Sequence, residues 1–258
     1  MASLKHVSAC EYNPFEAIKT NVIGTQNVID VAINEEVDKV IFTSSDKAIN
    51  PYNVMGATKL LAERLITAAN YYKGLRKTVF SSVRFGNVLG SGGSIFPIFK
   101  TQIQRGGPIT LTDPKMTRFV MSVSQVISLL FKATGMAQGG EVFILKMPAL
   151  KILNLAEVMI EAFSNRYGFS KDKIEIKIIG RKPGEKLFEE LMTQTEAERS
   201  LETKEMFIVL PEIIELSHID KSHYPTAKPA QLRSYRSDDA KILTKLEIGD
   251  MLREGGLL

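Results

Sequence analysis

The stretch from Val40 to Lys59 constrains the fold of this chain more than any other part of it. It begins with the run VIFT at 40–43, whose apolar and β-branched side chains predict a strand buried in a parallel sheet. Four polar residues, SSDK at 44–47, follow where such a strand would leave the sheet. Ligands of open α/β sheets bind outside the carboxyl ends of the strands. We therefore expect a functional site at this strand end.

A helix is predicted directly after this strand end. Asn50, Pro51 and Asn53 indicate a turn, and the residues that follow form one apolar helical face: Val54, Ala57, Leu60, Leu61 and Leu65. Met55 and Lys59 are four residues apart, so both lie on one side of the first turns. Taken singly, these features have plainer interpretations: a solvated lysine, a methionine in the core, and a Ser-Ser-Asp run that caps the next element. Together they favour an active site.

Length and composition exclude several classes of protein. The 258 residues suffice for one large domain or two small ones. Cys10 is the only cysteine, so an intramolecular disulfide is excluded and a reducing, cytoplasmic setting is expected. The sequence shows neither a signal peptide nor an apolar run of membrane-spanning length. The net charge is +4 with scattered basic residues, so nucleic acid is not an expected partner, and we predict no metal site.

Strand-like and helical segments alternate along the chain, which is typical of a parallel α/β sheet. Strands are predicted at 40–43, 78–84, 141–146 and 174–179, and helices at about 14–36, 54–72, 123–137, 153–167 and 243–253. The first helix has Asn13 as its cap and Pro14 at its first position. Residues 1–7 resemble the end of a strand, and the tail beyond Leu210 is expected to wrap the surface.

Five motifs carry a resemblance to a known family: LKHVSACEYNPFEAIKTNVIGTQNV, SSDKAINPYNVMGATK, VRFGNVLGSGGSIFPIF, ITLTDPKMTRFVMS and IIGRKPGEKLFEEL. In this order they resemble the extended short-chain dehydrogenases, and among these the inverting UDP-N-acetylglucosamine 4,6-dehydratases of surface-polysaccharide synthesis. They cover most of residues 4–192. The resemblance implies a Rossmann-like doubly wound parallel sheet, a smaller α/β substrate domain, and NAD or NADP as cofactor.

The resemblance also implies a division of the chain. Residues 1–93 and 119–147 would form the remainder of the NAD(P)-binding domain, and 94–118 and 148–258 the substrate-binding region and tail. Such a domain opens with a strand, a glycine-rich turn and a helix that holds the pyrophosphate. The chain has no such opening, so we predict an N-terminal truncation that removes the first strands. We expect the chain alone to aggregate, or to be completed by an N-terminal partner segment or a homo-oligomer.

The chemistry implied by the resemblance is 4,6-dehydration of a UDP-N-acetylhexosamine through a 4-keto intermediate. Asp46 matches the family's acid for the leaving hydroxyl at carbon 6, and Lys47 matches its base at carbon 5. Lys59 matches the lysine that binds the nicotinamide ribose, and Ser44 and Ser45 are assigned to the sugar hydroxyls. The plainer alternative for Asp46 and Lys47 is a surface ion pair.

Met55 stands where most of the superfamily carries the tyrosine of Y-x-x-x-K. A thioether neither takes nor gives a proton, so another group must handle the hydroxyl at carbon 4. Methionine is frequent here in the large polysaccharide dehydratases, which favours that branch; decay of the site is the alternative. Met55, Val88 and Lys5 are expected beside the cofactor, and His6 is either structural or part of the site.

The predicted substrate contacts lie mostly in the second half of the motifs. Guanidinium pairs bidentately with phosphate oxygens, so Arg118 and Arg181 are assigned to the diphosphate. Asn87 matches a residue that contacts the nucleotide-sugar phosphates, and Glu185 is assigned to the uridine ribose. The full predicted substrate set is Lys5, Ser44, Ser45, Asn87, Gly92, Ile95, Arg118, Arg181 and Glu185.

Two other functions remain open at this point. A UDP-sugar 4-epimerase on the same fold needs no acid–base pair for elimination, and Asp46 with Lys47 argues against it. A catalytically silent fragment, which binds UDP-sugar or pairs with an upstream polypeptide, is favoured by the missing glycine-rich turn.

Overall fold

The computed structural model describes residues 3–213, 219–231 and 233–258, and these form two compact units. Unit 1 comprises Met1–Phe85, Ile127–Lys146 and Glu190–Tyr235, and unit 2 comprises Gly86–Val126, Met147–Glu189 and Arg236–Leu258. These boundaries differ from the expected ones in four places. Residues 190–235 belong to unit 1 because they add strands to its sheet, whereas 86–93, 119–126 and residue 147 belong to unit 2.

Unit 1 is built on a six-stranded sheet that is half parallel and half antiparallel. Its strand order is β1 (Lys39–Ser45), β2 (Val79–Phe85), β6 (Val142–Leu145), β11 (Met206–Val209), β10 (Ser200–Glu202) and β12 (Lys228–Pro229). The first three strands are parallel, and the last three are antiparallel to their neighbours. Ser44 lies opposite Arg84 and Ser45 opposite Phe85, so the carboxyl ends of β1 and β2 are level.

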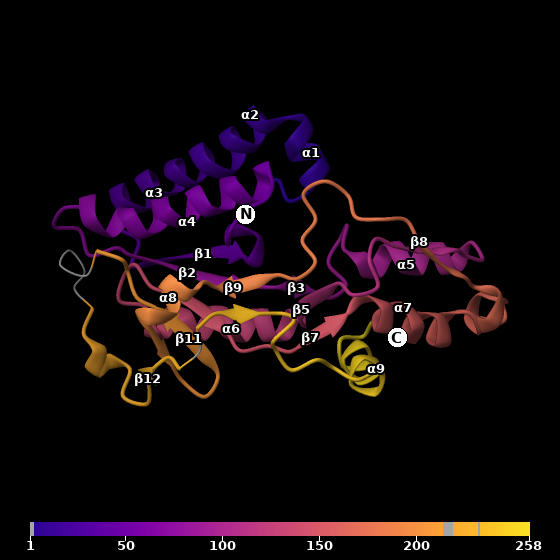
Figure 1. The fold of residues 1–258 in the computed structure, drawn as a ribbon. Coiled ribbons are helices and arrows are strands. Elements are labelled where there is room, and N and C mark those ends of the chain that lie inside the picture. Colours follow the sequence, from indigo (N-terminus) through magenta and orange to yellow (C-terminus); the bar gives the residue numbers. More distant parts are fainter. Residues whose placement is uncertain (1–2, 214–218, 232) are drawn as a thin grey trace. The chain divides into compact units, whose positions relative to one another are not determined.

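Helices cover both faces of this sheet. α3 (Gly24–Asn34) and α4 (Val54–Tyr72) lie along one face of β1 and β2, and α6 (Val123–Met136) lies along the other (Figure 1). The α3–α4 face packs around Phe42 and Phe80, and the α6 face packs around Val83 and Phe143. Burial on both faces explains why these strands are near-continuous apolar runs.

The segment before α3 differs from the sequence prediction. The single helix expected over 14–36 is divided into α2 (Pro14–Ala17), the π-helical segment η1 (Ile18–Ile23) and α3. The strand end expected over 1–7 is wrong for the described part, since α1 (Val7–Tyr12) begins at Val7. Instead of a strand partner, the Asn21 side chain hydrogen-bonds both backbone groups of Leu4. Asn21 Oδ1 accepts from the Leu4 N–H at 2.9 Å, and Asn21 Nδ2 donates to the Leu4 carbonyl at 3.0 Å.

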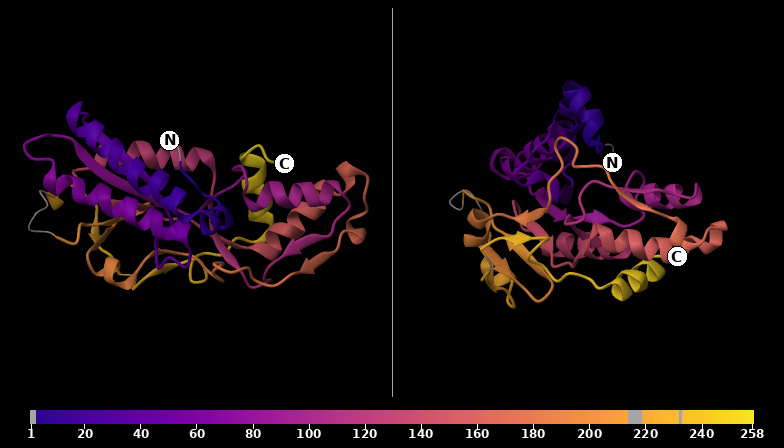
Figure 2. Two further views of the ribbon diagram at one scale, coloured as in Figure 1. Left: turned by 90° about the horizontal axis from the view of Figure 1, so that it is seen from above. Right: turned by 45° about the vertical axis from the view of Figure 1, so that its right-hand side comes forward.

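Unit 2 is built on two small sheets and three longer helices (Figure 2). One sheet joins β3 (Asn87–Val88), β5 (Thr117–Met121) and β7 (Ala149–Lys151), and the other joins β4 (Ile109–Leu111) and β8 (Ile176–Ile178). The helices are α5 (Ile95–Gln104), α7 (Ile152–Phe163) and α9 (Lys245–Glu254), whose apolar faces share one core with the sheets. The strand end at Val88 and the start of α5 position several of the predicted substrate residues.

Short elements complete the chain: the 3-10 helices η2 (Asp46–Ala48), η3 (Asn165–Tyr167), η4 (Lys171–Lys173) and η6 (Lys221–His223), the helix α8 (Gln194–Glu198), and the strands β9 (Glu190–Met192) and β13 (Tyr235–Arg236). Apart from the N-terminal segment, the predicted strands and helices lie within a few residues of the observed ones. Within the described ranges, no helix combines the length and apolar character needed to cross a membrane.

A buried ionic network joins three elements of unit 1. The fully buried Arg84 guanidinium, at the end of β2, pairs with Glu63 of α4 at 2.6 Å and Glu196 of α8 at 2.9 Å. It also donates to the carbonyl of Leu191 at 2.7 Å. Burial alone would lower the pKa of Arg84, but the two carboxylates raise it above its ordinary value. Arg84 is therefore a structural cation.

Candidate functional site

The polar end of β1 forms a tight turn around the Asp46 carboxylate. Ser45 precedes η2, and its hydroxyl accepts a hydrogen bond from the Lys47 backbone N–H at 3.3 Å. The same hydroxyl donates to Asp46 Oδ1 at 2.8 Å, and Lys47 Nζ donates to that oxygen at 2.9 Å. Asp46 is fully buried, whereas the Lys47 side chain is 29% exposed. The structure therefore joins Ser45, Asp46 and Lys47 in one hydrogen-bonded cluster, and the acid role of Asp46 and the base role of Lys47 stay predictions.

Two buried oxygens at this strand end lack a hydrogen-bond partner among the described residues. They are the second carboxylate oxygen of Asp46, Oδ2, and the hydroxyl of Ser44. The large majority of buried side-chain polar atoms in proteins are hydrogen-bonded, so such atoms call for an explanation. A ligand or an ordered water at the end of β1 would supply the missing partner. Asp46 thus has one carboxylate oxygen hydrogen-bonded within the protein and one without a partner among the described residues.

The start of α4 is held against this turn by side chains from two helices. Asn53 Oδ1 accepts from Gly56 N at 2.8 Å, and Glu11 Oε1 of α1 accepts from Val54 N at 2.6 Å. These bonds satisfy two of the free N–H groups at the helix end. A Cβ on Gly56 would lie only 2.4 Å from the Lys47 carbonyl oxygen. Only glycine allows α4 to approach η2 this closely, so Gly56 and Glu11 are site-supporting residues that the sequence reasoning missed.

Met55 is packed in the interior beside this turn. Its side chain is 3% exposed and belongs to an apolar cluster with Cys10 and Ala17. Burial raises the pKa of the Cys10 thiol, and the nearby Glu11 charge adds to this effect. The packing agrees with the plainer interpretation of Met55 as a core residue. Its predicted place beside a cofactor stays a prediction.

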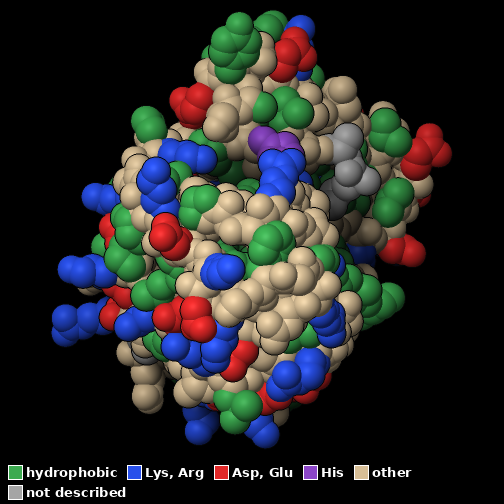
Figure 3. Space-filling model, turned by 90° about the vertical axis from the view of Figure 1, so that its right-hand side faces the viewer, with side chains coloured by type: hydrophobic (Ala, Val, Ile, Leu, Met, Phe, Trp, Pro, Cys, Tyr) green, Lys and Arg blue, Asp and Glu red, His purple; other side chains and the backbone are tan. Residues whose placement is uncertain are grey.

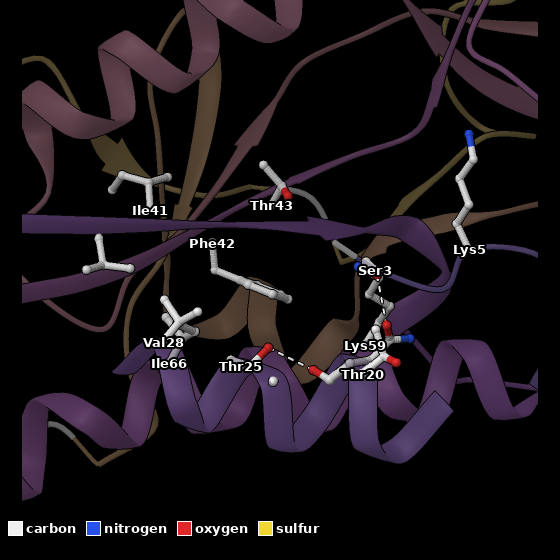
Figure 4. Close-up of a pocket in the computed structure, with 13 residues that line it drawn as sticks. Ser3, Lys5, Thr20, Thr25, Val28, Ile41, Phe42, Thr43, Lys59 and Ile66 are labelled. Carbon is white, nitrogen blue, oxygen red and sulfur yellow. Dashed lines mark hydrogen bonds between the residues drawn. The ribbon is translucent and has the colours of Figure 1, made fainter. Parts of the chain in front are cut away.

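Lys59 lies on a cavity of about 600 Å³ between α3, α4 and β1 (Figure 4). Burial lowers the pKa of Lys59, and its ammonium lies 5.6 Å from the centre of the Phe42 ring. The lining residues are Ser3, Lys5, Thr20, Asn21, Gly24, Thr25, Val28, Val40, Ile41, Phe42, Thr43, Lys59 and Ile66. Lys5 and Lys59 therefore share one cavity, and their predicted contacts with a cofactor stay predictions. Asp46 and Lys47 do not line it.

Asn21 is a further residue that sequence reasoning missed. It is 3% exposed, comes from the π-helical segment, and donates to Thr58 Oγ1 at 3.0 Å besides its two bonds to Leu4. Thr58 in turn donates to the Met55 carbonyl at 2.8 Å. Asn21 thus ties the segment that carries Lys5 to the helix that carries Lys59. The sequence gives no local signal for Asn21, because Lys19 and Thr20 directly before it are polar as well.

In unit 2, four predicted residues surround a small cavity of about 10 Å³: Asn87, Val88, Ile95 and Arg118. A space of this size holds at most one water molecule. The hydroxyl of Ser94, which precedes α5 and also lines the cavity, is buried without a hydrogen-bond partner in the described part of the chain. The space around Gly92 is open, with no atom within 4 Å of an added Cβ.

The Arg118 guanidinium is engaged by the protein itself. It donates to the carbonyls of Thr117 at 2.7 Å and Lys186 at 2.9 Å, and it lies 3.6 Å from Glu189. Arg118 therefore anchors the loop that follows Glu185 to strand β5. Its assignment to a diphosphate stays a prediction, and a ligand would have to compete with these bonds.

Arg181 and Glu185 lie in the loop after β8, and neither lines the cavity of Asn87. The Arg181 side chain is 54% exposed and lies 4.0 Å from Asp113. Glu185 Oε2 accepts from the Lys182 backbone N–H at 3.1 Å, which closes the loop on itself. Their predicted substrate contacts stay predictions. His6 is exposed and precedes α1, and its side chain makes no capping hydrogen bond there.

A family model described as "Polysaccharide biosynthesis protein" matches residues 1–211. The chain belongs to this family. It is 55% identical over 253 residues to "Uncharacterized membrane protein MJ1061" of Methanocaldococcus jannaschii, covering 98% of this chain and 73% of that protein. It also resembles the X-ray structure of Pen from Bacillus thuringiensis, with 48% identity and a TM-score of 0.90, over all of this chain and 75% of that one.

Two kinds of reaction occur among the named relatives. The UDP-N-acetylglucosamine 4,6-dehydratase (inverting) of Campylobacter jejuni is 41% identical over 82% of this chain and 60% of that protein. A UDP-glucose 4-epimerase of Rickettsia rickettsii is 37% identical over 97% and 72%. The chain spans only 32% of the capsular polysaccharide biosynthesis protein CapD of Staphylococcus aureus, to which it is 48% identical.

Solved nucleotide-sugar enzymes support the fold. One such structure is the dTDP-glucose 4,6-dehydratase DesIV of Streptomyces venezuelae, solved with NAD and TYD bound. The match covers 72% of this chain and 64% of the DesIV chain, with a TM-score of 0.63. At 18% identity this likeness shows the fold alone. It confirms the predicted α/β, Rossmann-like architecture of the extended short-chain dehydrogenases.

Proposed function

We propose that this chain carries the acid–base centre of a 4,6-dehydratase for a UDP-N-acetylhexosamine, with UDP-N-acetylglucosamine as the preferred substrate, in surface-polysaccharide or glycan synthesis. The observation that carries the proposal is the buried Asp46 carboxylate, with Oδ1 held by Lys47 and Oδ2 without a partner among the described residues. The 41% identity to a dehydratase of this specificity supports it.

In the proposed elimination, Lys47 acts at carbon 5 of the sugar and Asp46 acts at the hydroxyl of carbon 6. In a 4-keto hexose, Lys47 removes the proton at carbon 5, and the electron pair forms a double bond between carbons 5 and 6. Asp46 gives a proton to the hydroxyl of carbon 6, which leaves as water. The pair thus takes up one proton and delivers another at adjacent carbons, which its 2.9 Å hydrogen bond suits. The Ser45 hydroxyl donates a hydrogen bond to Asp46 Oδ1 and so orients the carboxyl group.

A nicotinamide nucleotide, when bound, would supply the hydride acceptor at carbon 4 and the donor at carbon 6. The described residues fit one part of this group. Lys59, partly buried and on the same cavity as Lys5, offers an ammonium to ribose hydroxyls. Val88 and Met55 are proposed to lie beside the nicotinamide. No glycine-rich turn for the pyrophosphate precedes β1 in the described ranges, so no residue is assigned to that group.

For the substrate, we propose that the start of α5 receives the diphosphate. Helix N-termini present free N–H groups to anions, and the unpartnered Ser94 hydroxyl points to a ligand at this helix end. Three predicted substrate residues lie close to Ser94 in the sequence: Asn87, Gly92 and Ile95. Arg118 lines the same small cavity as Ser94. Arg181 and Glu185 would reach the nucleotide only after a movement of their loop.

The alternative function is UDP-sugar 4-epimerisation, which the 37% identity to a UDP-glucose 4-epimerase favours. An epimerase returns hydride to carbon 4 and has no use for an acid at carbon 6. A third possibility is a chain that is silent until a partner segment joins it. The reaction product distinguishes the 4,6-dehydratase from the 4-epimerase.

The test is incubation of the purified chain with UDP-N-acetylglucosamine and NAD⁺ or NADP⁺, with the 6-deoxy-4-keto product followed by NMR. We expect product from the wild type and none from Lys47→Ala. Lys146→Ala is the matched control, because the Lys146 side chain is also 29% exposed and pairs with Glu202 at 2.6 Å. Full turnover by Lys47→Ala, with a 4-epimer as product, would establish the epimerase instead.

A further inference from the structure

The turn that carries Asp46 and Lys47 ends in an unusual backbone conformation at Asn50. The φ angle of Asn50 is +42°, in the left-handed region that residues other than glycine rarely adopt. Asparagine tolerates this region better than most residues do, because its short polar side chain can form hydrogen bonds there. Pro51 follows directly, and the residue before a proline normally takes an extended backbone. Such a conformation persists only where surrounding contacts hold it, so Asn50 calls for a fixed partner.

The side chain of Glu190 is that partner. Asn50 Nδ2 donates to Glu190 Oε2 at 2.7 Å, although the two residues are 140 positions apart in the sequence. A hydrogen bond to a carboxylate is shorter and stronger than one between neutral groups. Glu190 is half-buried at the start of strand β9, whereas Asn50 is exposed. The bond therefore fastens the end of the turn to a strand from the second half of the chain.

Strand β9 is a firm support for this bond. Leu191 and Met192 of this strand are fully buried, and the Leu191 carbonyl accepts from the buried Arg84 guanidinium at 2.7 Å. Strand β9 also lies against η2, the 3-10 helix of the turn. A continuous set of contacts therefore runs from Arg84 in the core through β9 to Asn50, which lies three residues after Lys47.

Three contacts hold the backbone of the turn. Ser45 Oγ accepts from the Lys47 N–H at 3.3 Å at its beginning, Gly56 of α4 approaches the Lys47 carbonyl in its middle, and Asn50 is bonded at its end. The Lys47 side chain is 29% exposed, so packing alone does little to fix its ammonium. The place of Lys47 Nζ beside Asp46 thus depends on the conformation of this backbone.

We propose that Asn50 and Glu190 are positioning residues of the proposed elimination. Neither is assigned a contact with the sugar. Their hydrogen bond holds the turn in the conformation in which Lys47 Nζ lies 2.9 Å from Asp46 Oδ1. Catalysis is sensitive to such geometry, because a misplacement of about 1 Å can cost roughly 100-fold in rate. The inference rests on the proposed function and adds to it two residues that act through the turn.

The first test compares two replacements of Glu190 in the NMR assay. Glu190→Ala removes the acceptor, so we expect kcat to fall at least ~10-fold while KM for UDP-N-acetylglucosamine stays within about twofold. Glu190→Gln keeps an acceptor oxygen at the same length, and should hold kcat within about threefold of the wild type. Glu202→Ala is the matched control, because Glu202 is also half-buried and accepts from Lys146 at 2.6 Å. It should turn over as the wild type does.

The second test separates the Asn50 side chain from its backbone. Asn50→Gly permits a positive φ without strain but removes the bond to Glu190, so kcat should fall while the urea midpoint stays unchanged. Hydrogen–deuterium exchange over residues 44–53 should be faster in Asn50→Gly and Glu190→Ala, and unchanged in Glu190→Gln and Glu202→Ala. This measurement needs no turnover. A wild type that forms no 6-deoxy-4-keto product would contradict the proposed function, and the exchange would still decide whether the bond holds the turn.

Four results would overturn the proposal. The first is a Glu190→Ala variant with the kcat and the exchange of the wild type. The second is an equal loss of kcat in Glu190→Ala and Glu202→Ala, which would indicate a general loss of stability. The third is a raised KM with unchanged kcat, which would make Glu190 a substrate contact. The fourth is a Glu190→Gln variant as slow as Glu190→Ala, which would show that the charge matters and the hydrogen bond does not.

Discussion

Two ionic clusters lie at the level carboxyl ends of neighbouring strands, and they are built in opposite ways. At the end of β2, Arg84 is fully buried and meets two carboxylates and a carbonyl. At the end of β1, Asp46 is equally buried, but one of its oxygens has no partner among the described residues and its cation is 29% exposed. A complete network stabilises the fold, whereas an incomplete one leaves capacity for a ligand. The comparison supports a structural role for Arg84 and the role that we propose for Asp46 in the reaction.

The largest effect is expected from Arg84→Met, which leaves Glu63 and Glu196 buried without their cation. Breaking a buried pair from one side costs about 3–5 kcal/mol of unfolding free energy. Urea unfolding followed by circular dichroism measures it. Arg64→Met is the control, since Arg64 is 52% exposed and 3.4 Å from an exposed Glu212, and it should change stability by less than about 1 kcal/mol. Equal losses in both variants would contradict the structural role of Arg84.

Asp46→Asn should show the reverse pattern. The amide oxygen still accepts the Ser45 hydrogen bond, so the unfolding free energy should stay within about 1 kcal/mol of the wild type. The loss of the proton donor should lower the rate of product formation at least ~10²-fold. The two measurements are the NMR assay and urea unfolding on one preparation. An active Asp46→Asn would remove the carboxyl group from the mechanism.

Acid should weaken the β2 cluster specifically. Burial by itself raises the pKa of Glu196, but the charge and hydrogen bonds of Arg84 outweigh it and hold the pKa below the ordinary 4.5. A folded-state pKa below the unfolded one gives stability that is present above pH 4.5 and is lost as the pH falls through the folded value. Urea midpoints across this range should fall in the wild type, and the gap to Arg84→Met should narrow. A gap that widens in acid would contradict this sign.

The smallest effect is expected at the start of α4. Asn53→Ala removes the cap on Gly56 N and should cost about 1 kcal/mol of unfolding free energy. Thr193→Ala, at the capping box of α8, is the matched control for a helix that carries no predicted catalytic residue. Both should melt earlier by a similar amount. Only Asn53→Ala should also lower activity, because it loosens the helix end beside Lys47.

The local parts of the β1 cluster were predictable, and the long-range parts were not. The strand, the polar run after it and the helix with Lys59 follow from apolar periodicity and turn residues within twenty positions. The bonds of Glu11 to Val54 and Asn21 to Thr58 join residues far apart in the sequence, which no local pattern reveals. Likewise, Arg84 reads as part of an apolar strand until the structure brings Glu196 to it from 112 residues away.

The sheet of unit 1 likewise combines strands that local sequence patterns predict with strands that they do not reveal. The parallel strands were predicted from apolar runs, but residues 190–235 were assigned to the substrate region although they supply three antiparallel strands of unit 1. Short strands such as β10 and β12 have too few residues for a period to show. On the face in Figure 3, Lys and Arg side chains are interspersed with Asp and Glu and with apolar side chains, as the scattered charges of the sequence indicated.

The close approach at Gly56 couples the turn of residues 46–48 to the start of helix α4, so that the two are expected to change together. Because a Cβ there would lie 2.4 Å from the Lys47 carbonyl, no side chain is admitted unless the turn moves as well. Saturation mutagenesis should therefore find Gly56 intolerant to every single replacement, with rescue only from second changes in residues 46–50. Evolution of a new specificity at this strand end would have to proceed by exchanging turn and helix start together.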